Sequence, residues 1–240
     1  MPKIITIGSQ LVTMGSKLLI KEFTPKDVPG LKLWVNGDNV IKDGSNYVSQ
    51  LTDLSNNSFH LVQTTQINKP LWVDNQFNGY PIIKFDGIND FLQVIFGETF
   101  YQPQTFFIVM NSLQPAPSYG AVYQGSQSPF KTFLIVGPGT IMYNDGTVGF
   151  TYIKVSPWNS LLLNTLHNGV NSAIYENGIL KNSGSAGAAT SITQLRIGLR
   201  WDNSSPLNAE IAEIIFYNAA LNLANRQNVE NYLMSKYNLT

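Results

Sequence analysis

The sequence contains no cysteine and only two histidines. Disulfides and thiolate metal sites are therefore excluded. His60 and His167 each lack a second ligand at metal-binding spacing, so zinc chemistry based on histidine is not expected. The chain also lacks the Gly-x-Ser-x-Gly elbow of serine hydrolases and a phosphate-binding glycine motif with its lysine.

Charge is scarce and evenly balanced. Charged residues make up 12% of the chain, with 15 Lys plus Arg against 15 Asp plus Glu. A nucleic-acid-binding protein needs a basic surface, so no nucleic acid partner is expected. The polar surface must come mainly from Asn, Ser, Thr and Gln, which suit neutral partners such as sugars or other protein surfaces.

Long hydrophobic runs are missing as well. No stretch is apolar and long enough to span a membrane, so membrane insertion is not expected. The segment Met1–Gly8 does not have the pattern of a secretory signal. We therefore expect the protein to be made and assembled in a cytoplasm, or to be exported by another route.

What the sequence does contain is a series of short strand signals. A length of 240 residues with 43% hydrophobic residues suits one large β-sandwich. Asn177-Gly178, between two apolar runs, is the strongest short hairpin signal. The expected strands include Leu31–Val35, Pro81–Phe85, Phe91–Val94, Thr105–Met110, Thr132–Val136, Thr147–Tyr152, Ser160–Thr165, Ser172–Glu176, Gln194–Gly198 and Glu210–Tyr217.

The end of the chain predicts one helix. Asn222 is a suitable N-cap, and Val229, Leu233 and Tyr237 recur every four residues after it. The sequence thus predicts an all-β protein, a two-sheet antiparallel sandwich with a short C-terminal helix.

Residues 1–29 differ from the rest of the chain. They combine alternating apolar residues with a linker-like segment, Phe23–Gly30, that holds two prolines. We place a boundary near Pro29, which gives an N-terminal β-arm of residues 1–29 and a domain of residues 30–240. The arm either adds strands to another subunit or virion protein, or folds back as edge strands of its own sandwich. We expect the first, and hence an oligomer or a larger assembly, because exposed apolar strands favour pairing.

Three stretches together resemble the concanavalin A-like, laminin-G-like jelly-roll domains of bacterial and phage proteins. The first is Leu31–Asp38, followed by Asp53–His60 and Lys69–Trp72. The second and most specific is Gly79–Leu92, and the third is Glu210–Tyr217 with the helix after it. The resemblance covers roughly residues 31–238. It implies a concanavalin A-like jelly roll, and the arm is similar to the N-terminus of some phage virion proteins.

The resemblance implies a non-enzymatic bacteriophage virion protein with a lectin-like domain. It would serve as a head decoration, a fibre or a tail component, localised to the virion and made in the host cytoplasm. The alternative is a free or cell-surface carbohydrate-binding module. Glucanases of this fold use Glu-x-Asp-x-x-Glu, and this chain has no Glu-x-Asp. We expect Asp86 to accept backbone N–H groups in a glycine turn and Asp90 to begin the next strand, rather than a catalytic pair.

Glycan binding would use aromatic residues beside amides or carboxylates in loops. The candidates are Tyr143, Asn144, Trp158, Asn159, Trp201 and Asp202. For each aromatic residue, a lid over the core is the alternative interpretation. The resemblance also implies a possible calcium ion, for which Asp145 and Asp202 would be donors. Simple Asx-turn chemistry is the alternative for both aspartates.

Overall fold

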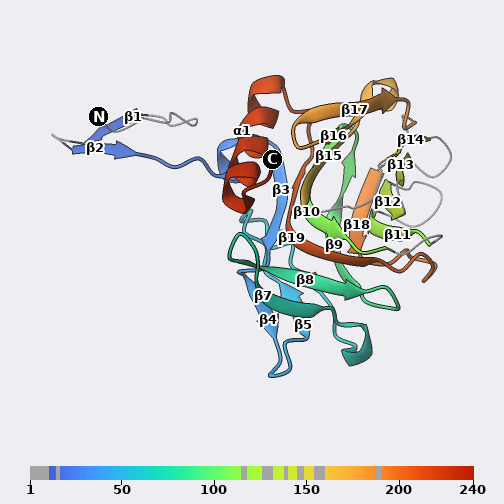
Figure 1. The fold of residues 1–240 in the computed structure, drawn as a ribbon. Coiled ribbons are helices and arrows are strands. Elements are labelled where there is room, and N and C mark those ends of the chain that lie inside the picture. The colour runs from blue at the N-terminus through green and yellow to red at the C-terminus, as the bar shows by residue number, and fades with distance from the viewer. Residues whose placement is uncertain are drawn as a thin grey trace.

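A computed structural model describes residues 11–14, 17–114, 118–125, 132–137, 140–144, 149–153, 160–187 and 191–240. Its main body consists of two antiparallel sheets and one C-terminal helix, so the predicted jelly-roll sandwich is confirmed. Figure 1 shows the two sheets stacked face to face, with the helix against the outer face of one of them. No helix in the described ranges is long and apolar enough to cross a membrane.

The first sheet has the strand order β17-β16-β15-β10-β19-β8-β7, and β3 also pairs with β19. Strand β19 is long enough to pair with β8 through its first half and with β3 through its second half. The strands of this sheet are β3 (Leu31–Asn36), β7 (Leu71–Phe77), β8 (Tyr80–Asp86), β10 (Gln104–Ser112), β15 (Leu161–His167), β16 (Ser172–Glu176), β17 (Ile179–Gly184) and β19 (Asn208–Tyr217).

The second sheet has the order β14-β13-β12-β11-β18-β9-β6-β5-β4. Its strands are β4 (Val40–Lys42), β5 (Val48–Leu51), β6 (Leu61–Val62), β9 (Leu92–Tyr101), β11 (Gly120–Gln124), β12 (Phe133–Gly137), β13 (Thr140–Asn144), β14 (Gly149–Ile153) and β18 (Ser191–Ile197). Short 3-10 helices lie at η1 (Pro25–Asp27), η2 (Gln66–Asn68) and η3 (Gly169–Asn171). The sequence analysis did not assign strands β4, β5, β6, β7, β11 and β13.

The main core fills the space between the two sheets. Phe106 of β10 stacks on Tyr123 of β11, with ring centroids 4.3 Å apart, and on Phe216 of β19, at 4.5 Å. Alternate residues of β10, including Phe107 and Val109, point to the other face and pack beneath the helix. Both faces of the central strands are thus buried, which explains why Phe106–Met110 is an unbroken apolar run.

Helix α1 (Leu223–Tyr237) begins and ends as the sequence predicts. The Asn225 N–H donates to Asn222 Oδ1 at 2.9 Å, so Asn222 is the N-cap. Val229, Leu233 and Tyr237 are buried against the outer face of the first sheet. The expected hairpin also forms between β16 and β17, where Asn177 and Gly178 both have positive φ, 49° and 77°.

The N-terminal hairpin, defined as β1 (Leu11–Met14) and β2 (Lys17–Ile20), stands apart from the sandwich. Within the described residues these two strands pair with each other and with no other strand. Figure 1 shows the hairpin extending away from the body, on the side where α1 lies. The division into an arm of residues 1–29 and a domain of residues 30–240 remains a prediction.

The segment after the hairpin lies against the body. Pro25 and Val28 are buried, and the hydroxyl of Tyr217 donates to the Pro25 carbonyl at 2.8 Å. The ring of Phe23 contacts that of Tyr232 on α1, with centroids 6.2 Å apart. The stretch that looked like a linker in the sequence is therefore fixed to the domain from about Phe23 onward.

Candidate functional site

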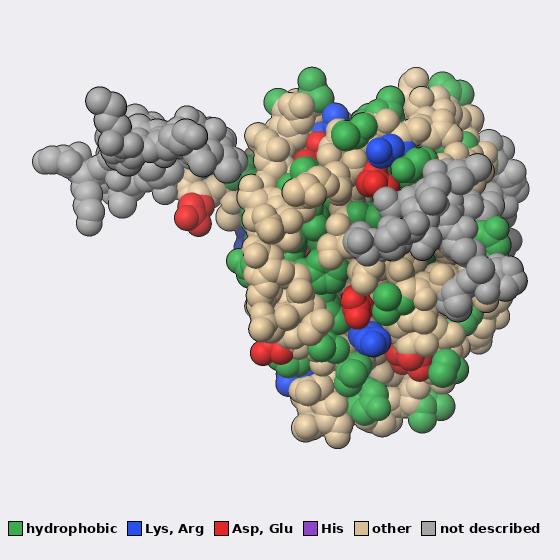
Figure 2. Space-filling model, in the orientation of Figure 1, with side chains coloured by type: hydrophobic (Ala, Val, Ile, Leu, Met, Phe, Trp, Pro, Cys, Tyr) green, Lys and Arg blue, Asp and Glu red, His purple; other side chains and the backbone are tan. Residues whose placement is uncertain are grey.

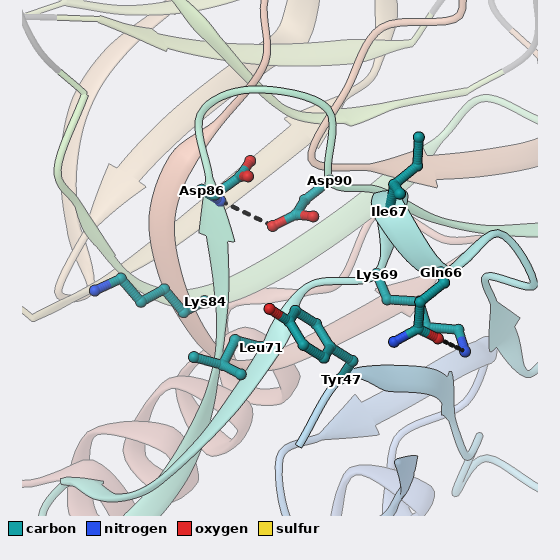
Figure 3. A pocket seen from close by; sticks show the side chains of 8 residues that line it. All are labelled: Tyr47, Gln66, Ile67, Lys69, Leu71, Lys84, Asp86 and Asp90. Atoms are coloured by element: carbon teal, nitrogen blue, oxygen red, sulfur yellow. Dashed lines mark hydrogen bonds between the residues drawn. The ribbon is translucent and has the colours of Figure 1, made fainter. Parts of the chain in front are cut away.

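A cavity of about 500 Å³ opens beside the turn that joins β8 to β9. We call it the Asp90 pocket. Figure 3 shows the side chains around it, which come from the β4–β5 connection, η2, β7, β8 and the β8–β9 turn. They are Tyr47, Gln66, Ile67, Lys69, Leu71, Lys84, Asp86 and Asp90. A volume of this size is typical of small-ligand sites.

The β8–β9 turn places two carboxylates on one side of the Asp90 pocket. Gly87 has φ +78°, a conformation that favours glycine, and allows the chain to reverse directly after β8. Asp86 Oδ1 accepts the N–H of Ile88 at 2.8 Å, as the sequence predicts. Asp90 Oδ2 in turn accepts the N–H of Asp86 at 3.0 Å (Figure 3). The turn is thus held by its own two acids.

Asp90 is the unusual member of this pair. Asp90 is only 7% exposed, whereas Asp86 is exposed. Burial, together with the negative charge of Asp86, raises the pKa of Asp90 to about 7. The carboxyl of Asp86 also forms a side-chain hydrogen bond with that of Asp90. This acid is therefore largely buried beside a second acid at the wall of the pocket.

Polar side chains linked by hydrogen bonds form the opposite wall of the Asp90 pocket. Lys69 Nζ donates to Gln66 Oε1 at 2.8 Å, and Gln66 Nε2 donates to Asp43 Oδ2 at 2.8 Å. The bond from Gln66 is the main cause that lowers the pKa of Asp43. Asp43 also accepts the N–H of Tyr47 at 3.0 Å. These bonds fix η2 and the loop before Tyr47 relative to each other.

The sequence analysis did not identify this pocket. A signal for it exists in Asp43-Gly44-Ser45-Asn46, a turn followed at once by Tyr47, which is the same combination of turn acid and aromatic residue used to choose the other candidates. Nothing local indicates, however, that this turn meets η2 and the β8–β9 turn.

Trp201 and Asp202 lie together in the loop between β18 and β19. One face of the Trp201 ring is stacked on the guanidinium of Arg196, whose carbon is 4.1 Å from the ring centroid and 4.1 Å from that of Phe91. The Trp201 indole N–H donates to the Gly125 carbonyl at 2.5 Å. Trp201 is thus half-buried, with one of its two faces occupied by Arg196.

Asp202 has the environment of an Asx turn. Its Oδ1 accepts the N–H and the hydroxyl of Ser204 at 3.0 and 2.6 Å, and its Oδ2 forms an ion pair with Arg200 at 3.2 Å. A search of the described residues finds no group of three or more His, Asp or Glu side chains that could hold a metal.

For the other residues predicted to bind a glycan or calcium, the structure does not describe the side chains. Tyr143 and Asn144 belong to strand β13, where the backbone is described, rather than to the expected loop. Two strands, β12 and β11, separate β13 from β18, a backbone distance of about 14 Å at ordinary strand spacing. Asp145, Trp158 and Asn159 lie outside the described residues.

Other polar groups are buried for structural reasons. Glu213 lies beneath α1 and is 1% exposed. Its Oε1 accepts from Trp34 Nε1 at 2.6 Å and from the Tyr232 hydroxyl at 3.2 Å. Its Oε2 accepts from Lys236 Nζ and from the Tyr237 hydroxyl, both at 2.7 Å. These four bonds tie the helix to the sheet.

The two histidines also have structural roles. His60 Nδ1 accepts the N–H of Asp53 at 3.0 Å. His167 is fully buried, and its Nε2 lies 2.9 Å from the hydroxyl of Tyr123. Burial lowers the pKa of His167 well below its usual value, so it is neutral in the folded protein.

The fold has relatives among solved structures. No protein-family model matches the sequence, and no curated protein matches it. Trypanosoma rangeli sialidase in complex with sialic acid matches with a TM-score of 0.62 and 13% identity, over 87% of this chain and 33% of the sialidase chain. The binding domain of botulinum neurotoxin serotype D matches with a TM-score of 0.63 and 11% identity, over 85% of this chain and 51% of that chain.

The receptor-binding domain of botulinum neurotoxin mosaic serotype C/D matches similarly, with a TM-score of 0.61, 12% identity and coverage of 88% of this chain and 52% of that one. The chain thus spans about a third of the sialidase and half of the toxin domains. At these identities the likeness shows the β-sandwich fold alone.

Proposed function

We propose that this chain is a non-enzymatic surface protein of a bacteriophage particle, in which a lectin-like sandwich is attached through its N-terminal hairpin. The observation that carries this proposal is the separation of β1 and β2 from both sheets of the body. A hairpin of two strands is at most marginally stable alone, so one that extends from its own domain needs a partner surface.

The composition of the N-terminal segment supports attachment to a protein. Apolar residues are dense there, and exposed apolar strands favour pairing with another chain. They are Ile4, Ile5, Ile7, Leu11, Val12, Met14, Leu18, Leu19 and Ile20. The partner of this surface would be another virion protein or a second copy of the chain.

The surface of the sandwich suits a domain that faces outward from a particle and contacts neutral partners. Figure 2 shows charged side chains scattered over the visible face, with no broad patch of either sign. Such a surface matches neutral partners better than nucleic acid. The toxin neighbours are described as binding or receptor-binding domains, and the sialidase neighbour was solved with sialic acid. These likenesses support a role in adhesion to glycans.

A deletion tests the attachment. A variant lacking residues 1–20 keeps Phe23, Pro25 and Val28, which pack on the body, and should unfold at the same midpoint as the full chain. We expect it to fail to copurify with particles. The control lacks residues 1–29, and it should lose stability because Pro25 and Val28 are removed. Normal assembly of the shorter deletion would refute attachment through the hairpin.

The second candidate is a free or cell-surface carbohydrate-binding module. The Asp90 pocket favours it, because it combines an exposed tyrosine with two carboxyl groups and the amide of Gln66. This candidate predicts polysaccharide binding without any association with particles. Both candidates are non-catalytic, and hydrolysis of a polysaccharide that disappeared on changing a single Asp or Glu would contradict both.

A further inference from the structure

We infer that the Asp90 pocket binds a neutral saccharide. The inference rests on the lectin-like role proposed above and deepens it, since it gives that role a site and a class of ligand. Three features of the Asp90 pocket support it: an apolar rim, a pair of carboxyl acceptors at its side, and a balance of charge. Each can be followed in Figure 3.

The rim offers surface for the C–H face of a sugar ring. Tyr47 is 40% exposed and Ile67 is 74% exposed, and both border the cavity. Tyr47 is held in place by a backbone bridge to Leu71 and by the bond from its N–H to Asp43. A rigid, exposed aromatic ring at the edge of a cavity costs little conformational entropy when it packs against a ligand.

The side formed by the β8–β9 turn offers hydrogen-bond acceptors. Asp90 is more than nine-tenths buried, and its Oδ2 accepts the backbone N–H of Asp86. Figure 3 shows the Asp90 carboxyl directed into the space between the turn and η2, with the Asp86 carboxyl beside it. Two adjacent carboxyl groups at the wall of a cavity offer acceptors that a ligand with several hydroxyl groups can use.

The charge around the Asp90 pocket favours a neutral ligand over an ionic one. Lys69 and Lys84 line the Asp90 pocket together with Asp86 and Asp90, so positive and negative groups are equal in number. In Figure 3 the ammonium of Lys84 points away from Tyr47 and Asp90, and its alkyl chain lines the cavity. A phosphate or an acidic sugar would approach two carboxylates, and a free cation would meet the Lys69 ammonium at the rim. A hydroxyl-rich neutral ring meets neither obstacle.

The test is saccharide binding by the full chain, observed as line broadening or saturation transfer in ligand NMR. The probes are an array of neutral oligosaccharides built from glucose, galactose, mannose and N-acetylglucosamine, with glucuronate oligosaccharides as the acidic set. We expect at least one neutral probe to bind and the acidic set not to bind. Asp90→Asn should weaken that binding at least tenfold, because the second carboxylate oxygen is replaced by an amide donor.

Two further variants locate the site. Tyr47→Ala should also reduce binding at least tenfold. Tyr101→Ala is the matched control, because Tyr101 is 68% exposed and lies at the other end of β9 from the turn that carries Asp90. We expect it to bind as the wild type does. Near pH 4, where the wild-type Asp90 carboxyl is protonated, Asp90→Asn should keep its thermal midpoint, which separates loss of the site from loss of the fold.

Three outcomes would overturn the inference: no neutral probe binds, only acidic probes bind, or binding survives both Asp90→Asn and Tyr47→Ala. None of these results depends on the N-terminal hairpin. A protein that binds saccharides but does not attach to particles would refute the proposed attachment and leave the site standing. The opposite pattern would refute the site alone.

Discussion

Glu213 and Asp90 are both buried acids, 1% and 7% exposed, but they differ in how many hydrogen-bond donors reach their carboxyl groups. Glu213 receives four donors, two on each oxygen, from Trp34, Tyr232, Lys236 and Tyr237. Asp90 receives one, from the backbone of Asp86, and has a second acid as its neighbour. A buried carboxylate with all its acceptors satisfied holds elements together, whereas one that lacks donors is a candidate for binding.

Asp53 supports this contrast. It is 8% exposed and accepts from the backbone N–H groups of Trp34, Ser55 and Phe59 and from the Ser55 hydroxyl. Like Glu213, it joins segments that are distant in sequence. The Asp90 turn instead lines a cavity, as the proposed binding site requires.

Replacing Glu213 should produce the largest effect. Glu213→Ala leaves Lys236 without its close carboxylate partner, although the lysine side chain is only 12% exposed, and removes the acceptor for Trp34 Nε1 and two tyrosine hydroxyls. We expect a loss of about 3–5 kcal/mol in the free energy of unfolding, measured in urea. Glu213→Gln, which keeps one acceptor oxygen, should lose less. A loss below about 1 kcal/mol for Glu213→Ala would show that these bonds do not hold the helix.

Replacing Asp90 should instead raise the free energy of unfolding at neutral pH and above. The folded pKa is about 7 against an ordinary value of 3.8, so the folded protein binds more protons between these pH values. The stability that Asp90 contributes is therefore complete below pH 4 and is lost as pH rises through 7. Asparagine does not ionise, so Asp90→Asn should not lose stability at this position as pH rises.

We expect Asp90→Asn to match the wild type near pH 4 and to exceed it by about 4 kcal/mol in the free energy of unfolding at pH 8. Urea unfolding of both proteins between pH 4 and pH 8 measures the difference, in which other titrating groups such as His167 cancel. A difference that does not change with pH would mean that Asp90 titrates normally.

Removing one donor from Glu213 should have a smaller effect than removing the acid. Tyr237→Phe deletes the hydroxyl that donates to Oε2 at 2.7 Å and leaves the ring packed against Phe77 and Tyr80. We expect a loss of about 1.5 kcal/mol, because hydrogen bonds to charged groups are stronger than neutral ones. Chemical denaturation tests this, and a value equal to that of Glu213→Ala would contradict a contribution shared among four donors.

The smallest effect should come from Asp86→Asn. The amide oxygen of asparagine can still accept the N–H of Ile88, so stability should change by only about 0.5 kcal/mol. The pKa of Asp90 should fall but stay above its ordinary value, since burial is the larger cause of its shift. Carboxyl carbon NMR titration of Asp90 measures this. An unchanged pKa would show that the charge of Asp86 does not reach Asp90.

The sequence by itself determined the local features of this protein. The alternation of apolar residues gave most strands, Asn177-Gly178 gave the β16–β17 hairpin, and Asn222 with the Val229, Leu233 and Tyr237 stripe gave the helix. The role of Asp86 in its turn was also predictable, because an Asx residue binds N–H groups two residues ahead. These features depend on neighbours within a few residues.

Only the tertiary structure decided which segments meet. Trp34 and Glu213 are 179 positions apart in the sequence, and they meet because β3 pairs with β19. The Asp90 pocket likewise unites Tyr47, Gln66 and Asp90 from three separate connections. Periodicity and turn propensity indicate the conformation of each segment but do not specify the order of strands in a sheet. The donors that reach each buried acid, and hence the contrast between Glu213 and Asp90, follow from that order.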